Sequence, residues 1–88
     1  MSKILFVTSL GCTPCIRVKR ILHELQAEMP DLIIEEVEFG STAGSKLAVE
    51  NRILYPPAVF LNGRLIAKGK IDADRMIWTI RESNGASN

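Results

Sequence analysis

The chain is 88 residues long, which suits one compact domain, and its 47% hydrophobic and 24% charged residues are typical of a soluble globular protein rather than a disordered one. Eleven lysines and arginines against ten aspartates and glutamates leave a net charge of +1, so nucleic acid is not an expected partner. No apolar run approaches the ~20 residues of a membrane helix, so no membrane partner is expected.

The first half of the chain predicts a strand, a helix and a second strand. Lys3–Thr8 is an apolar run without a helical period, which favours a central strand buried on both faces. A helix is expected from Thr13 or Pro14 to Met29, because proline suits the first helical turn. Asp31–Phe39 predicts a second strand, and its three glutamates suit the edge of a sheet.

The second half begins with a helix from Ser41, the expected N-cap, to about Arg52. Asn62-Gly63 then separates two short apolar runs, at 58–61 and 64–68. This dipeptide is a strong hairpin signal, because both turn residues accept a positive φ. The two runs therefore predict a pair of antiparallel strands.

A last helix is expected from Asp72, its N-cap, to Arg81, followed by a flexible polar tail over 83–88. The element order βαβαββα predicts one α/β domain over residues 1–82. Its first β-α-β unit closes as a parallel crossover, and the hairpin adds two antiparallel strands. The expected architecture is a four-stranded mixed sheet flanked by helices.

The two cysteines form a single Cys-x-x-Cys pair, Cys12 and Cys15. Two cysteines cannot build a disulfide framework, and in a reducing compartment such a pair is more often catalytic or metal-binding than structural. The four apolar residues after Lys3 fall short of the roughly 7 to 15 of a signal peptide. A cytoplasmic location is therefore expected.

A helical wheel makes the two cysteines unequal. Cys15 falls on the apolar stripe of the first helix, whereas Cys12 lies about 120° away from it, before the first full turn. The stripe contains Pro14, Cys15, Val18, Ile21, Leu22, Leu25 and Met29. Cys12 is thus expected to be exposed at the helix N-terminus, where free N–H groups favour the thiolate, and Cys15 to be shielded. Thiol–disulfide exchange requires this asymmetry, because one thiol attacks the substrate and the other resolves the mixed disulfide.

Together, the strand, the segment Gly11-Cys12-Thr13-Pro14-Cys15, the helix and the later segment Tyr55-Pro56-Pro57 before the hairpin resemble the thioredoxin and glutaredoxin superfamily in its minimal form. The resemblance spans about residues 3 to 82. It implies a thioredoxin-like fold in which Pro57 is a cis-proline packed against the redox pair, since X–Pro is the bond type where cis is favourable enough to occur.

By this resemblance the protein is expected to be a dithiol–disulfide oxidoreductase that transfers electrons to protein disulfides. Cys12 and Cys15 would be catalytic, and the substrate would be bound by Gly11, Thr13, Pro14, Tyr55, Pro56 and Pro57. No cofactor is expected beyond the redox-active disulfide. A thioredoxin-reductase-like enzyme or glutathione would supply the electrons.

Several positions depart from the family patterns. Pro56 has no N–H to offer a substrate at the position before the expected cis-proline. Ser9 and Pro14 replace the Lys and Tyr that serve glutathione in glutaredoxins. Gly11 replaces the Trp that precedes the thioredoxin motif, and Phe6 replaces its buried Asp, the usual proton acceptor for the buried thiol.

Two alternatives remain open from the sequence. One is a glutathione-dependent glutaredoxin. The other is a soft-metal carrier that binds Cu(I) or zinc through the Cys12 and Cys15 thiolates. Such carriers are βαββαβ domains that end in a strand, whereas residues 74–81 predict a helix.

Exposed apolar residues near the motif offer a surface for a protein partner. Ile16 is expected beside Cys12, and with Leu10 and Tyr55 it would form an apolar rim, or these would be scattered exposed residues. Trp78 is expected to be a partly buried packing residue.

Overall fold

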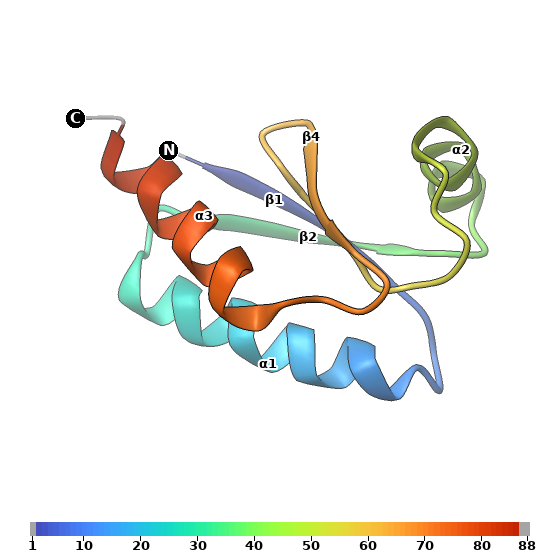
Figure 1. Cartoon of the computed structure of the whole chain (residues 1–88), viewed down its shortest axis with the longest axis horizontal. Helices are drawn as coiled ribbons and strands as arrows, with labels where there is room; N and C mark the ends of the chain where they lie inside the picture. The colour runs from blue at the N-terminus through green and yellow to red at the C-terminus, as the bar shows by residue number, and fades with distance from the viewer. Residues whose placement is uncertain (1, 87–88) are drawn as a thin grey trace.

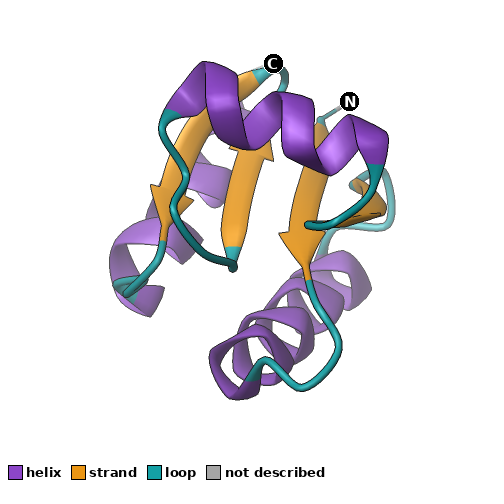
Figure 2. Ribbon diagram, turned by 90° about the vertical axis from the view of Figure 1, so that its right-hand side faces the viewer, coloured by secondary structure: helices purple, strands orange, loops and turns teal. Residues whose placement is uncertain are grey.

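The computed structural model describes residues 2–86, which form a mixed sheet with helices on both faces (Figures 1 and 2). The sheet contains β1 (Lys3–Thr8), β2 (Ile33–Glu38), β3 (Ala58–Leu61) and β4 (Arg64–Lys68), in the order β2-β1-β3-β4. β1 pairs with β2 in parallel and with β3 antiparallel, and β3 pairs with β4 antiparallel. The predicted α/β architecture is confirmed, with β1 central and the glutamate-rich β2 at an edge.

The helices α1 (Thr13–Glu28) and α3 (Ala73–Ala86) cover one face of the sheet, and α2 (Thr42–Asn51) covers the other. Alternate residues of β1 supply both cores. Ile4 and Phe6 pack against α1 and α3, whereas Val7 packs on the α2 side, and all three are fully buried. Each such side chain contributes roughly 1.5–3 kcal/mol by leaving water. β1, the strand that leads into the Cys-x-x-Cys segment, is therefore packed on both faces.

The predicted ends of the elements rest on side-chain caps and turn residues. Ser41 Oγ accepts a hydrogen bond from the Gly44 N–H at the start of α2 (3.0 Å), and Asp72 Oδ1 accepts one from the Arg75 N–H at the start of α3 (3.1 Å). The β3–β4 hairpin turns at Asn62-Gly63, whose φ values are 50° and 85°. Both caps and the hairpin turn are as the sequence predicts.

The buried stripe of α1 follows the helical wheel, with Cys15, Val18, Leu22 and Leu25 buried. Pro14, which the wheel also placed on the stripe, is exposed. It occupies the first turn of α1, where the helix has only begun to lie against the sheet.

Two predicted details of the C-terminal helix are wrong. α3 continues to Ala86, so residues 83–86, assigned to the polar tail, are helical, and residues 87–88 lie outside the described residues. Trp78 is not partly buried: 64% of it is exposed, because α3 packs through Met76 and Ile80.

β2 is also shorter than predicted. None of the helices within residues 2–86 is long and apolar enough to cross a membrane.

Candidate active site

The Cys-x-x-Cys pair lies at the junction of β1 and α1. Gly11 turns the chain between them with a φ of 77°, a conformation that favours glycine. Cys12 is the N-cap of α1, Thr13 is its first residue, and Cys15 is the third residue, within the first turn. The two cysteines are joined by a disulfide, with their Cα atoms 5.2 Å apart.

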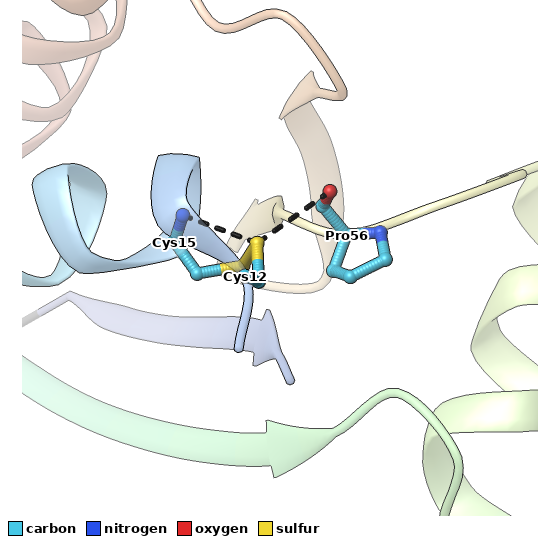
Figure 3. The surroundings of a disulfide bond; sticks show 3 residues. All are labelled: Cys12, Cys15 and Pro56. Atoms are coloured by element: carbon cyan, nitrogen blue, oxygen red, sulfur yellow. Dashed lines mark hydrogen bonds between the residues drawn. A yellow bond between two sulfur atoms is a disulfide. The ribbon is translucent and has the colours of Figure 1, made fainter. Parts of the chain in front are cut away.

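A backbone N–H of the first turn of α1 points at Cys12 (Figure 3). The backbone N–H of Cys15 donates to Cys12 Sγ at 3.2 Å, so the sulfur occupies the position that a capping oxygen takes in other helices. In the reduced protein, this N–H and the positive end of the helix stabilise a thiolate on Cys12. No donor to Cys15 Sγ is found among the described residues.

The cysteines differ in burial as the wheel indicates. Cys15 is 2% exposed and belongs to the core between the sheet and α1. Cys12 is half-buried rather than fully exposed, since it also packs against that core. Cys12 is therefore the more accessible of the two sulfurs.

The segment before β3 faces the disulfide. The Pro56–Pro57 peptide bond is cis, and Pro57 is fully buried. The carbonyl oxygen of Pro56 lies 3.9 Å from Cys12 Sγ (Figure 3). A disulfide sulfur carries no proton, so this contact becomes a hydrogen bond only when Cys12 is reduced to a thiol.

Two surface hollows flank the disulfide. The first, which we call the Pro57 hollow, has a volume of about 220 Å³ and is lined by Pro14, Arg17, Val18, Tyr55, Pro57, Gly69, Lys70 and Ile71. The second, the Cys12 hollow, has a volume of about 330 Å³ and is lined by Thr8, Ser9, Leu10, Gly11, Cys12, Cys15, Ile16, Lys19, Glu36 and Glu38.

The three residues predicted to form an apolar rim are all exposed, Leu10 at 95%, Ile16 at 61% and Tyr55 at 58%. They do not form one patch. Leu10 and Ile16 line the Cys12 hollow, and Tyr55 lines the Pro57 hollow. They frame the disulfide from opposite sides.

The structure brings most of the sequence-predicted site residues together. Gly11 lines the Cys12 hollow with the two cysteines, Pro14, Tyr55 and Pro57 line the Pro57 hollow, and Pro56 contacts Cys12. Thr13 is exposed at the start of α1 and lines neither hollow.

Sequence reasoning did not place Glu36, Glu38, Arg17 or Lys70 at the site. Glu36 is the register partner of the buried Phe6, and it pairs with Lys19 at 3.3 Å. The parallel β1–β2 register carries it there, and register was not predicted. Arg17 and Lys70 lie far apart in sequence and meet only because the loop after β4 returns to the start of α1. No sequence signal of the kind we used could place them together.

The charged side chains do not build a multidentate metal site. Within residues 2–86, no group of three or more His, Cys, Asp and Glu side chains lies close enough to hold a metal ion.

Comparison with solved structures identifies the fold. Thioredoxin O2 from Arabidopsis thaliana in its oxidised state is similar over 93% of this chain and 74% of its own length, with a TM-score of 0.72 and 19% identity. The chain has a thioredoxin-like fold. Mitochondrial thioredoxin 3 from Saccharomyces cerevisiae gives a TM-score of 0.70 at 19% identity, covering 92% of this chain and 77% of that one. Thioredoxin from Trypanosoma brucei brucei gives 0.70 at 16% identity, covering 97% and 76%.

Sequence comparison alone does not reach this thioredoxin-like fold. No protein-family model matches the chain, and no curated protein matches its sequence. The likeness lies in the arrangement of the elements and in the disulfide at the start of α1, which the sequence-based resemblance also indicated.

Proposed function

We propose that the protein is a thiol–disulfide oxidoreductase that reduces protein disulfides with the Cys12–Cys15 dithiol. The observation that carries the proposal is the asymmetric pair at the N-terminus of α1. Cys12 Sγ receives the Cys15 N–H and is half-buried, whereas Cys15 is 2% exposed. The thioredoxin-like fold of the chain supports this chemistry, because Cys12 caps the helix N-terminus and lines an open hollow.

The reaction is a pair of displacements at sulfur. The Cys12 thiolate attacks one sulfur of the substrate disulfide, forms a mixed disulfide and expels the other substrate sulfur as a thiolate. The Cys15 thiolate then attacks Cys12 Sγ, which forms the Cys12–Cys15 bond and releases the second substrate sulfur. Two electrons and, after protonation, two protons pass to the substrate, and an external dithiol or glutathione must reduce the enzyme again.

Pro57 and Tyr55 would guide the substrate chain. Both residues line the hollow beside the disulfide. The missing N–H of Pro56 leaves fewer backbone hydrogen bonds for the substrate, so side-chain contacts in the hollows would contribute more of its affinity. Gly11, Thr13 and Pro14 would complete the surface around the attacking sulfur.

A cytoplasmic location forms part of the proposal. A cysteine pair in a chain without any other cysteine suits a compartment where thiols are kept reduced, and where a reductase or glutathione can recharge the pair. We propose no cofactor beyond the two cysteines.

The test is turnover of a protein disulfide such as insulin with a dithiol as reductant. Wild type should accelerate the reduction, and Cys12→Ser should abolish the acceleration. Cys15→Ser should retain attack on the substrate but lose multiple turnovers. Full turnover by Cys12→Ser would show that the roles of the two cysteines are assigned wrongly.

Two other functions are separable from this one. A glutathione-dependent glutaredoxin would reduce a mixed glutathione disulfide with glutathione and glutathione reductase, and absence of that coupling removes it. A soft-metal carrier would bind one Cu(I) or zinc ion in an anaerobic titration followed by mass. The helix α3 at the C-terminal end of the described chain differs from the final strand that the carrier alternative requires.

A further inference from the structure

Positive charge gathers on one side of the disulfide. A third surface hollow, which we call the Leu54 hollow, is lined by Arg52, Leu54, Tyr55, Lys68 and Gly69. It shares Tyr55 and Gly69 with the Pro57 hollow, so the two hollows adjoin at these two residues and together outline one groove. The charged residues along this groove are Arg17, Arg52, Lys68 and Lys70, and no carboxylate lines it. We call it the basic groove.

These four cations are available to a ligand. All four are exposed, and none forms an ion pair with a carboxylate within the described part of the chain. Lys68 Nζ donates to the Arg52 carbonyl oxygen at 3.2 Å, which holds its charge beside the groove. Exposed cations without partners create a positive potential that attracts an anionic segment.

Two carboxylates lie within two residues of these cations along the chain, Glu50 and Asp72, and neither lines the basic groove. Asp72 caps α3 by accepting from the Arg75 N–H, and the hollow that it lines also contains Lys68, Lys70 and Arg75. Positive charge therefore exceeds negative charge there as well.

The floor of the basic groove is held in place. The Gly69 N–H donates to the Pro57 carbonyl oxygen at 2.8 Å, tying the loop after β4 to the segment beside the disulfide. Gly69 has a φ of 65°, and a Cβ there would lie 3.2 Å from Cε1 and the hydroxyl oxygen of Tyr55. The Tyr55 ring thus rests directly on Gly69, so that the groove passes over a fixed aromatic surface. Figure 1 shows the loop after β4 running beside the segment that precedes β3.

The opposite side of the disulfide has the other sign. The Cys12 hollow contains Glu36 and Glu38, and its single cation, Lys19, pairs with Glu36 at 3.3 Å. A substrate whose sulfur sits at Cys12 thus meets cations along one flank and carboxylates along the other. An acidic flank is attracted to the basic groove and repelled from the Cys12 hollow.

We propose that the preferred substrates are proteins with an acidic segment on one side of the target cysteine, bound along the basic groove. The proposal rests on the proposed oxidoreductase function and names its substrate class. Glutathione, a small tripeptide, would reach the cations next to Pro57, whereas a longer chain also reaches Arg52 and Lys68 beyond Tyr55. The extent of the groove therefore favours a polypeptide.

The experiment compares three disulfide-bonded peptides that differ only in the flank of one cysteine, which is acidic, amide-substituted or basic. At low ionic strength, wild type should reduce the acidic peptide about tenfold faster in kcat/KM than the amide peptide, and the basic peptide more slowly. The preference should vanish at about 1 M salt, where the Debye length falls to about 3 Å.

Charge reversal locates the effect. The double variant Lys68→Glu with Lys70→Glu should lower kcat/KM for the acidic peptide about tenfold or more, and should abolish the preference for it over the amide peptide. The matched control is Lys46→Glu with Arg64→Glu, which alters the net charge equally at exposed positions that line none of the three hollows. The control should keep the wild-type preference.

Three results would overturn the proposal. The first is equal reduction of the acidic and amide peptides by wild type, and the second is an equal loss of preference in both double variants. The third is a loss with oxidised glutathione as large as that with the acidic peptide, which would assign the groove to a small ligand. Failure to reduce any of the three peptides would instead overturn the proposed function itself, and this proposal with it.

Discussion

At the scale of residues, the chemistry depends on what surrounds each sulfur. Cys12 Sγ accepts the Cys15 N–H, whereas Cys15 is packed in the core. Between them, Thr13 and Pro14 carry no charge. The helix N-terminus is therefore the main source of thiolate stabilisation at Cys12.

This environment predicts a reducing potential. Strongly oxidising pairs stabilise their thiolate with additional charge, and neither residue between Cys12 and Cys15 supplies any. We expect a reduction potential between about −280 and −200 mV. Equilibration against a glutathione redox buffer, read by thiol alkylation, measures it. A value near about −120 mV would identify an oxidant and contradict the assignment as a reductant.

Lys19 provides a test of how local this stabilisation is. It lines the Cys12 hollow, but Glu36 offsets its charge and solvent screens the pair, whose side chains are 51% and 38% exposed. The pair should therefore change the stability of the thiolate only slightly. Since 30 mV corresponds to about 1.4 kcal/mol, we expect Lys19→Ala to shift the reduction potential by less than about 10 mV. Lys46→Ala, on the distant α2, is the control. A shift of about 30 mV or more in Lys19→Ala alone would show that the side chain, not the helix terminus, controls Cys12.

At the scale of elements, a glycine controls how α2 meets the sheet. A Cβ on Gly44 would collide with the backbone carbonyl oxygens of Glu38 and Phe39, at the end of β2. Alanine normally stabilises a helix interior by about 1 kcal/mol relative to glycine. Here the cost of the collision should exceed this gain in helix propensity, so Gly44→Ala should lower the free energy of unfolding by about 1–3 kcal/mol.

Denaturant unfolding of Gly44→Ala and the neighbouring Ser45→Ala measures this effect. Ser45 is exposed, so its replacement should be neutral or slightly stabilising. If Gly44→Ala were as stable as wild type, α2 would not approach β2 as closely as the structure shows.

The elements themselves were largely predictable because their signals are local. Capping residues, the Asn62-Gly63 turn and the apolar stripe of α1 act within a few residues of one another, and each was found where expected. The end of α3 was not, because residues 83–86 carry weak local signals and the helix simply continues. Trp78 was misplaced because the packing direction of α3 depends on its tertiary contacts.

At the scale of the whole molecule, the site depends on contacts between distant segments. That Pro57 packs against Cys12 and Cys15 was predicted from the family resemblance, not from the residues themselves. The charge pattern around them needed the parallel register of β2 and the return of the loop after β4, which place Glu36 and Lys70 on opposite sides of the disulfide. Neither arrangement leaves a local signal in the sequence.

The same whole-molecule arrangement explains why one sulfur is reached first. Cys12 lies after β1 at the start of α1, near the surface. Cys15 is buried in the core between the sheet, α1 and α3. A substrate should therefore form its covalent intermediate with Cys12, and Cys15 should act only afterwards.

Trapping that intermediate is the most direct test of this account. Cys15→Ser and Cys12→Ser are each incubated with a disulfide-bonded peptide, and the adducts are located by intact mass and peptide mapping. We predict that Cys15→Ser accumulates a mixed disulfide on Cys12 and that Cys12→Ser accumulates almost none. Capture of the peptide by Cys15 in Cys12→Ser, at the rate seen for Cys12, would contradict the roles assigned to the two cysteines.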